Sequence, residues 1–372
     1  MRWESQKITH DGGAPATEPS LLPLAGLVRT VRTPEFAGIT FHEVTAKSVL
    51  NKVPPTSSMP FSWTINPFRG CSHACVYCFA RKTHSYLNLD TGLDFDAQLV
   101  IKINAAEVLE RELARPSWNR DHVALGTNTD PYQRAEGRYR LMPGIISALA
   151  DSGTPFSILT KGTLLARDIP LLKAAARSVS VGMGISLALL DPVLAESIEP
   201  GTPAPKARVA LISRLREAGL PCGVMAMPIL PWLTDGDESL DQLFGALASA
   251  GATGVTAGPL HLRPGSREWF MQWLAAHHPH LVPRYESLYS GGSYASKEYR
   301  DWLSDRIRVF RRKHGLTAGA GFFRNLSPSG PGTSGRTGAS GSSGHPSGSD
   351  DAGQPPSTRR APSARAIQTS LF

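Results

Sequence analysis

Short apolar runs alternate with longer amphipathic stretches through the middle of the chain. The runs typical of strands are residues 62–65, 99–103, 122–125, 156–160, 179–185, 223–227 and 254–257. Stretches with helical spacing of apolar positions are residues 105–114, 144–150, 169–176, 205–218 and 240–250, and a helix-rich region follows at 266–313. Strands that alternate with helices predict βαβ units around a parallel sheet, an α/β fold. Six or so units predict an open or partial barrel with its functional loops at the carboxyl ends of the strands.

Both ends of the chain depart from this pattern. Residues 1–57 are punctuated by Pro and Gly, and only 38–53 look ordered, so we expect a partly ordered N-terminal extension before a core domain at 58–315. From residue 327 the sequence is rich in Ser, Gly and Pro and has almost no apolar side chains. Such a segment cannot offset its ordering entropy by burial, so we expect a disordered tail at 327–372.

The composition favours a cytoplasmic protein with an acidic partner. The 372 residues are 41% hydrophobic, which is enough for a sizeable core. The chain has no apolar run of about 18 residues and no apolar stretch of signal-peptide type at its start. The net charge of +8 favours nucleic acid as a partner, although no compact Lys/Arg cluster with interleaved aromatic residues stands out.

Three of the four cysteines lie in one short segment, with the spacing Cys-x3-Cys-x2-Cys at Cys71, Cys75 and Cys78. Thiolates are soft ligands that suit iron–sulfur clusters, and three of them would leave the fourth iron of a 4Fe–4S cluster open to a small molecule. A structural zinc site needs four ligands. His73 is too close in sequence to complete a tetrahedron easily, and we expect Cys222 in a distant buried strand. Zinc, or a chance grouping of core cysteines, remains the alternative.

The cysteine segment, with an aromatic Tyr77 before its last cysteine, resembles the radical SAM superfamily. Further segments resemble more closely the branch related to spore photoproduct lyase, and in particular its uncharacterised relatives. They are NPFRGCSHACVYCFAR, GTNTDPYQRAE at 126–136, ILTKGTLLARD at 158–168, IEPGTPAPKAR at 198–208 and MPILPWLTD at 227–235. The resemblance spans about residues 38–313. It implies a partial (β/α)6 radical SAM barrel with flanking helices, a 4Fe–4S cluster and S-adenosyl-L-methionine as cofactors.

The resemblance also implies which side chains contact S-adenosylmethionine. Beside Tyr77, the positions that match the lyase's cofactor contacts are Thr129, Lys161 and Ser186. A lysine suits the methionyl carboxylate as a point charge, and hydroxyl groups suit the ribose or the amino group. No catalytic residue is identified, because Thr127 stands where the lyase has its hydrogen-donor cysteine. Repair of spore photoproduct itself is therefore not implied.

Several polar residues near these segments have two interpretations. Glu199 and Arg208 form either a structural ion pair that clamps their loop or a part of the site. Tyr132, Gln133 and Glu136 follow a predicted strand end and could line the pocket, and Tyr132 could supply a hydrogen atom.

The last five residues, QTSLF, resemble the peptide with which bacterial DNA enzymes dock on the polymerase sliding clamp. Gln368 would supply polar register, while Leu371 and Phe372 would be apolar anchors on a flexible tether. Thr369 departs from the usual leucine, and the alternative is a frayed terminus without a partner.

Together these observations predict a radical SAM enzyme, lyase-like or an oxidoreductase, that reductively cleaves S-adenosylmethionine. An electron donor such as flavodoxin or ferredoxin would feed the cluster. Hydrogen would be abstracted from a substrate for which DNA or another nucleic acid is the favoured class, with a role in DNA repair, and protein or tRNA the other classes. The alternative is a non-catalytic iron–sulfur or zinc module tethered to a DNA replication or repair partner.

Overall fold

The computed structural model describes residues 24–57 and 59–319. The chain divides into two compact units, Met1–Leu326 and Ser327–Phe372, and every described residue belongs to the first. The predicted tail and its terminal peptide, with Gln368, Leu371 and Phe372, lie outside the described residues.

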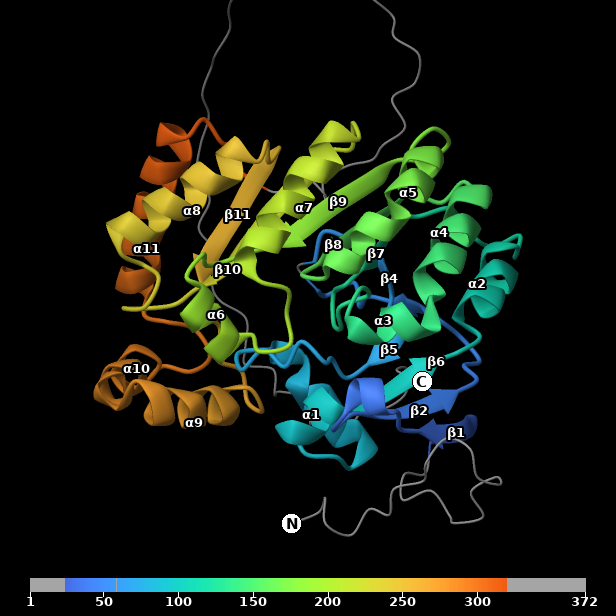
Figure 1. Ribbon diagram of the computed structural model, residues 1–372, viewed down its shortest axis with the longest axis horizontal. Helices are drawn as coiled ribbons and strands as arrows, with labels where there is room; N and C mark the ends of the chain where they lie inside the picture. Colours follow the sequence, from blue (N-terminus) through green and yellow to red (C-terminus); the bar gives the residue numbers. More distant parts are fainter. Residues whose placement is uncertain (1–23, 58, 320–372) are drawn as a thin grey trace, which may run out of the picture. The chain divides into compact units, whose positions relative to one another are not determined.

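The first unit is organised around a large sheet in which most strands are parallel (Figure 1). Its order is β11-β10-β9-β8-β7-β4-β3. The strands are β3 (Leu50–Lys52), β4 (Trp63–Ile65), β7 (Val123–Leu125), β8 (Phe156–Thr160), β9 (Val181–Ser186), β10 (Cys222–Ile229) and β11 (Gly254–Pro259). Neighbours from β4 to β11 pair in parallel, and β3 adds an antiparallel edge. The alternation of strands and helices therefore predicted the fold class correctly, and the sheet runs from edge to edge without closing.

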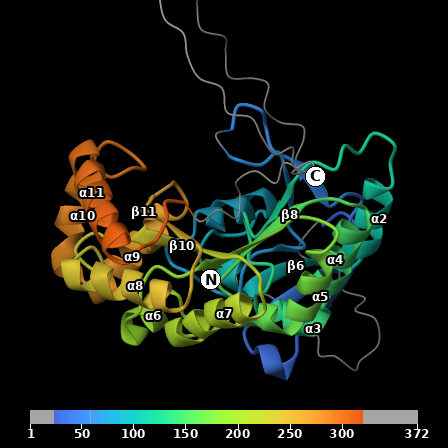
Figure 2. The same cartoon turned by 90° about the horizontal axis from the view of Figure 1, so that it is seen from above.

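Helices cover the outer face of this sheet and continue beyond β11. The helices up to β11 are α1 (Leu93–Ala97), α2 (Ala105–Leu113), α3 (Arg134–Tyr139), α4 (Leu141–Asp151), α5 (Ile169–Ala175), α6 (Pro192–Ile198), α7 (Pro205–Glu217) and α8 (Asp237–Ser249). The later ones are α9 (Arg267–His277), α10 (Val282–Leu288) and α11 (Lys297–Lys313). Helices α4, α5, α7 and α8 lie along one face of the strands (Figures 1 and 2). No helix in residues 24–57 and 59–319 is long and apolar enough to cross a membrane.

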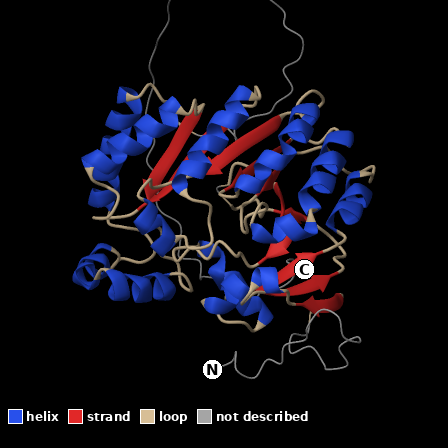
Figure 3. Cartoon of the chain, viewed as in Figure 1, coloured by secondary structure: helices blue, strands red, loops and turns tan. Residues whose placement is uncertain are grey.

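A second, smaller sheet lies beside the cysteine segment (Figure 3). Its order is β1-β2-β6-β5, with β1 (Leu27–Val31), β2 (Thr40–Val44), β5 (Phe68–Arg69) and β6 (Gln98–Lys102). The apolar run at 99–103 thus forms most of strand β6, which pairs with β2 and β5 rather than joining the large sheet. An apolar run alone does not specify which sheet a buried strand joins.

The central strands of the large sheet are buried on both faces, as parallel strands covered by helices should be. All six residues of β9 are buried. Cys222 begins β10 and is fully buried, and burial raises the pKa of its thiol to about 12. It is a core residue, as its apolar surroundings in the sequence predicted.

Candidate functional site

The cysteine loop, residues 70–78, leaves the short strand β5 and runs into the 3-10 helix Phe79–Leu87. Gly70 starts it at φ +83°, and a Cβ there would lie 3.0 Å from the carbonyl oxygen of Phe95, so the turn needs glycine. The N–H of Cys71 donates to that same carbonyl at 3.0 Å, and the N–H of Cys78 donates to the carbonyl of Cys75 at 3.2 Å. Cys71 and Cys75 are buried, while Cys78 is half-buried. One compact loop therefore carries all three thiols.

Arg81 is fully buried, and its guanidinium group holds this loop in place. Its Nε and Nη2 atoms donate to the carbonyl of Cys75 at 3.1 and 3.0 Å. The same side chain makes a two-pronged ion pair with Asp96, with Nη2 to carboxylate distances of 2.9 and 3.0 Å. Phe95 and Trp269 cover the guanidinium with their rings. A charged, planar side chain thus fixes the middle cysteine's backbone.

Gln133 holds the loop on both sides of its first cysteine. Its Oε1 accepts from the N–H of Ser72 at 2.8 Å, and its Nε2 donates to the carbonyl of Gly70 at 3.1 Å. The side chain is completely buried. The Gln133 amide therefore provides hydrogen-bond partners for two buried backbone groups, one on each side of Cys71. Without the amide these groups would lack partners.

Asp130, at the end of the loop that follows β7, ties three segments together. It accepts hydrogen bonds from the Thr160 hydroxyl at 2.5 Å and from the N–H of Lys161 at 2.6 Å, and lies 3.3 Å from Nδ1 of His73. Burial alone would lower the pKa of His73, but Asp130 and Cys71 raise it to about 10. Asp130 thus links the cysteine loop, through its ion pair with His73, to the end of β8, through its hydrogen bonds with Thr160 and Lys161.

The segment that follows α6 packs directly on the cysteine loop. The N–H of Val76 donates to the carbonyl of Ile198 at 3.0 Å, and the N–H of Gly201 donates to the carbonyl of His73 at 3.1 Å. A Cβ at Gly201 would lie 1.9 Å from the carbonyl oxygen of Ser72. Only glycine permits this approach of two backbones.

Five side chains form a polar group next to the cysteines, which we name the Glu199 cluster: Tyr77, Lys161, Ser186, Glu199 and Arg208. Lys161 Nζ donates to Ser186 Oγ at 2.7 Å and lies 3.7 Å from Glu199 Oε1. Arg208 Nη2 lies 2.7 Å from Glu199 Oε2, and the Tyr77 hydroxyl donates to the same carboxylate. Lys161 Nζ is 5.7 Å from the centre of the Tyr77 ring. Lys161 follows β8 and Ser186 ends β9, so adjacent strands bring the cluster together.

The Glu199 cluster is buried except for Tyr77 and Lys161, which are half-buried, and it carries more positive than negative charge. Burial would raise the pKa of the Glu199 carboxyl, but Lys161 and Arg208 hold it at about 2. Burial would lower the pKa of Lys161, but Glu199 and Cys75 raise it above its usual value. Two cations therefore face one carboxylate at neutral pH. Arg208 Nε is buried without a hydrogen-bond partner among the described residues.

The structure brings three of the four predicted cofactor contacts together, namely Tyr77, Lys161 and Ser186. Thr129 is buried, and its hydroxyl donates to the carbonyl of Phe68 at 2.9 Å, which joins the loop after β7 to β5. The pairing of Glu199 with Arg208 is present, and it belongs to the cluster as well as to its own loop.

Tyr132 and Glu136, which the sequence suggested as pocket residues, have their polar atoms engaged in the fold. The Tyr132 hydroxyl donates to Asp168 at 3.0 Å. Glu136 caps the start of α4 through two backbone N–H groups and pairs with Arg167 at 2.7 Å. A cavity of about 390 Å³ does include Tyr132 and His73 in its lining. The roles of Arg81 and Gln133 in holding the loop were not predicted from the sequence.

The donor set of the loop fits an iron–sulfur cluster. Burial raises the pKa of the Cys75 thiol, Glu199, Cys78 and Cys71 raise it further, and the Lys161 ammonium lowers it, so Lys161 favours a thiolate at Cys75. Soft thiolates suit a cluster, and a nearby cation such as Lys161 would offset its negative charge. Within 24–57 and 59–319, no three His, Cys, Asp or Glu side chains surround a single metal-ion position.

Known proteins share both the sequence and the fold. The family model of the Radical SAM superfamily matches residues 65–244. An uncharacterised protein of Mycobacterium tuberculosis is 58% identical over 318 residues, which cover 85% of this chain and 93% of the relative. An uncharacterised protein of Methanocaldococcus jannaschii is 26% identical over 197 residues, covering 53% and 70%.

Among solved structures, spore photoproduct lyase complexed with dinucleoside spore photoproduct has a TM-score of 0.55 at 15% identity, covering 74% of this chain and 79% of that one. A double mutant of the lyase, with bound AdoMet and dinucleoside spore photoproduct, has a TM-score of 0.54 at 15% identity, covering 71% and 76%. At such identity the likeness concerns the fold. The family match includes the cysteine loop, Lys161, Ser186 and Glu199, so the chain belongs to the radical SAM superfamily.

Proposed function

We propose that this radical SAM enzyme holds a 4Fe–4S cluster on Cys71, Cys75 and Cys78, cleaves S-adenosylmethionine reductively and abstracts hydrogen from a nucleic-acid substrate. The observation that carries the proposal is the Glu199 cluster, in which a largely shielded lysine ammonium is hydrogen-bonded to a serine hydroxyl and lies against Tyr77 of the cysteine loop. The family implies both an iron–sulfur cluster and S-adenosylmethionine. A cytoplasmic reductant such as flavodoxin or ferredoxin would deliver the electron.

The side chains of the Glu199 cluster suit an amino-acid cofactor. Lys161 offers a point charge to the methionyl carboxylate, and the excess positive charge of the Glu199 cluster favours that anion. Ser186 Oγ can accept from or donate to the ribose or the amino group. When bound, the iron–sulfur cluster supplies the electron that breaks a carbon–sulfur bond of S-adenosylmethionine. Arg81 and Gln133 keep the loop backbone fixed meanwhile.

Two observations favour nucleic acid as the substrate class. The net charge is +8, and the similar lyase structures hold a dinucleoside photoproduct. Thr127 occupies the place of the lyase's donor cysteine, and the Tyr132 hydroxyl is engaged with Asp168. We therefore propose a reaction on nucleic acid that differs from the lyase's in its hydrogen donor.

Anaerobic reconstitution with iron and sulfide tests the cofactor part. The protein should be brown, hold about four irons per chain and release 5′-deoxyadenosine when reduced with S-adenosylmethionine present. Cys75→Ala should lose the iron and the release, whereas Cys222→Ala should keep both because Cys222 lies in β10. A colourless protein with one zinc and no 5′-deoxyadenosine would indicate the non-catalytic module instead.

The substrate part is tested in the same reaction by adding irradiated or undamaged DNA, tRNA or protein extract. Faster 5′-deoxyadenosine release with DNA, and transfer of deuterium from labelled DNA into that product, are the expected results. Stimulation by tRNA or protein alone would reject DNA as the substrate.

A further inference from the structure

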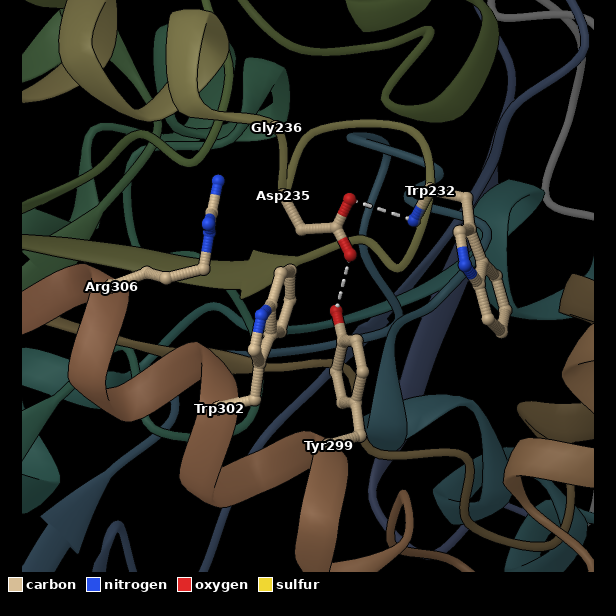
Figure 4. A pocket seen from close by; sticks show the side chains of 6 residues that line it. All are labelled: Trp232, Asp235, Gly236, Tyr299, Trp302 and Arg306. Atoms are coloured by element: carbon tan, nitrogen blue, oxygen red, sulfur yellow. Dashed lines mark hydrogen bonds between the residues drawn. The ribbon is translucent and has the colours of Figure 1, made fainter.

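An aromatic pocket opens at the carboxyl end of β10, and we name it the Trp232 pocket. Trp232, Asp235 and Gly236 from the loop after β10 line one side, and Tyr299, Trp302 and Arg306 from α11 line the other (Figure 4). Its volume is about 310 Å³, at the lower end of the size range of ligand pockets.

Asp235 fixes the walls of this pocket. Its carboxylate accepts from the N–H of Trp232 at 2.9 Å and from the Tyr299 hydroxyl at 2.8 Å, as the dashed lines in Figure 4 show. One buried carboxylate therefore joins the loop after β10 to α11. The Trp302 side chain is less constrained: the residue is 43% exposed, so its ring is accessible to a ligand.

Arginine side chains lie against the aromatic rings of the pocket. The Arg284 guanidinium lies 4.3 Å from the centre of the Trp232 ring, and the Arg306 guanidinium lies 4.7 Å from that of Trp302. Arg306 is also paired with Asp237. In the described part of the chain, no carboxylate forms an ion pair with Arg284. The pocket thus has beside it one guanidinium group that the protein itself does not neutralise.

The pocket lies at the same end of the large sheet as the Glu199 cluster. Lys161 follows β8, Ser186 ends β9 and the Trp232 loop follows β10, and these three strands are consecutive neighbours in a parallel sheet. Tyr77 and Trp232 also pack against one continuous apolar cluster that includes Leu230. A chain long enough to cross two strands could therefore occupy both sites.

We propose that the Trp232 pocket binds a nucleobase of a single-stranded segment of nucleic acid, with Arg284 at a phosphate. This inference rests on the proposed nucleic-acid substrate and adds a subsite to it. An aromatic face stacks any base and contributes about 1–3 kcal/mol per base. The Arg284 guanidinium, which no carboxylate of the described residues neutralises, makes the phosphate contact. A base within a duplex is already stacked and paired, so the base enters only where the strand is unpaired.

Fluorescence anisotropy with a labelled oligothymidine, its RNA equivalent and a duplex tests the proposal on the reconstituted protein. Trp302→Ala should weaken single-strand binding about 10-fold, and Trp302→Phe should restore most of it. Arg284→Ala should reduce the salt dependence of binding by about one phosphate contact. The matched controls on α11 are the exposed Val309→Ala and Arg308→Ala, since Arg308 is already paired with Asp305. Iron content and thermal unfolding verify that each variant is folded.

The outcomes separate this inference from the proposed function. If the parent protein binds single strands and Trp302→Ala and Arg284→Ala bind them as tightly as the controls do, the pocket is not the base site, and the substrate proposal stands. If the parent binds no oligonucleotide, both are wrong. If the parent carries zinc and releases no 5′-deoxyadenosine, but its binding depends on Trp302, the pocket inference stands alone. The DNA and RNA arms identify which strand is preferred.

Discussion

The cysteine loop and the Trp232 pocket lie at the same end of one sheet but are held in opposite ways. Around the loop, Arg81, Gln133 and Asp130 are buried or nearly so, and each ties several backbone groups. In the pocket, Asp235 is the buried carboxylate that joins the two walls, the Arg306–Asp237 pair beside it is partly exposed, and part of the Trp302 ring is open to solvent. The proposed iron–sulfur cluster would need a fixed backbone, whereas the proposed nucleic-acid strand would need accessible rings. The comparison predicts that substitutions near the loop change the free energy of unfolding and the binding of cofactors. Substitutions at the pocket should change only the affinity for nucleic acid.

The largest effect is expected at Glu199. Glu199→Gln leaves the buried Arg208 and the half-buried Lys161 without their carboxylate, which should cost about 3–5 kcal/mol in the free energy of unfolding. S-adenosylmethionine binding should fall as well. Urea unfolding and calorimetric titration under anaerobic conditions measure both. The exposed Glu196→Gln on α6 is the control, and equal stability of the two variants would contradict the assignment of a buried ion cluster.

Gln133 comes next, because it serves two buried backbone groups at once. Gln133→Leu removes the partners of the Ser72 N–H and the Gly70 carbonyl, at about 1–3 kcal/mol for each group. We expect the reconstituted protein to lose iron to a chelator several-fold faster. The exposed Gln242→Leu on α8 should release iron at the parent rate. Release of iron from Gln133→Leu at the parent rate would mean that the other contacts of the loop, such as those of Arg81, are sufficient to fix it.

Lys161→Met distinguishes cofactor affinity from cluster binding. Loss of a charge-assisted contact should weaken S-adenosylmethionine binding about 10- to 100-fold, while the iron content stays at the parent value. Equilibrium binding and iron analysis measure the two. The exposed Lys173→Met on α5 is the matched control. A variant without iron would show that Lys161 supports the loop rather than the cofactor.

A smaller effect is expected from His84, which packs behind the loop. Its Nε2–H donates to the carbonyl of Gln98 at 2.9 Å, and burial lowers its pKa to about 4. The unfolded chain therefore binds a proton at this histidine that the folded chain does not, so stability falls as the pH drops below about 6.5. Between pH 7.5 and 5.5 this should amount to about 1 kcal/mol. Urea unfolding at the two pH values should show that His84→Gln loses less stability than the parent.

The smallest effect on the cofactor chemistry is expected at the terminal peptide. Removal of residues 367–372 should leave 5′-deoxyadenosine release unchanged, since the cysteine loop and the Glu199 cluster lie in the other unit. Binding to a polymerase sliding clamp, measured by surface plasmon resonance, should be lost. Leu371→Ala with Phe372→Ala should have the same effect, and intact binding by that variant would reject the clamp proposal.

The sequence predicted those features that depend on local pattern. Alternating runs predicted the parallel strands. Short motifs singled out the cysteine loop, Lys161 and Ser186; the structure places Lys161 against Ser186, and their contact with a cofactor stays a prediction. Which sheet receives a strand depends on distant partners, so β6 could not be assigned to the small sheet. Thr129 matches a motif, but its hydroxyl is used by the backbone of β5.

The Trp232 pocket could not be found by reading along the chain. Its rings and guanidinium groups come from the loop after β10, from α10 and from α11, so no segment combines basic and aromatic residues strongly enough to stand out. The roles of Arg81 and Gln133 in holding the loop were missed for a related reason: the sequence does not show that a polar side chain is buried. The position of Arg81 three residues after Cys78 was the available signal.

The contact of Gly201 with Ser72 has a consequence for the order of biosynthesis. A ribosome delivers Cys71, Cys75 and Cys78 long before it delivers Ile198 and Gly201, whose backbone covers the loop. During that interval the nascent thiols lack both this cover and Glu199. The three thiols are therefore less enclosed while translation continues, and the site closes only once the segment after α6 has emerged.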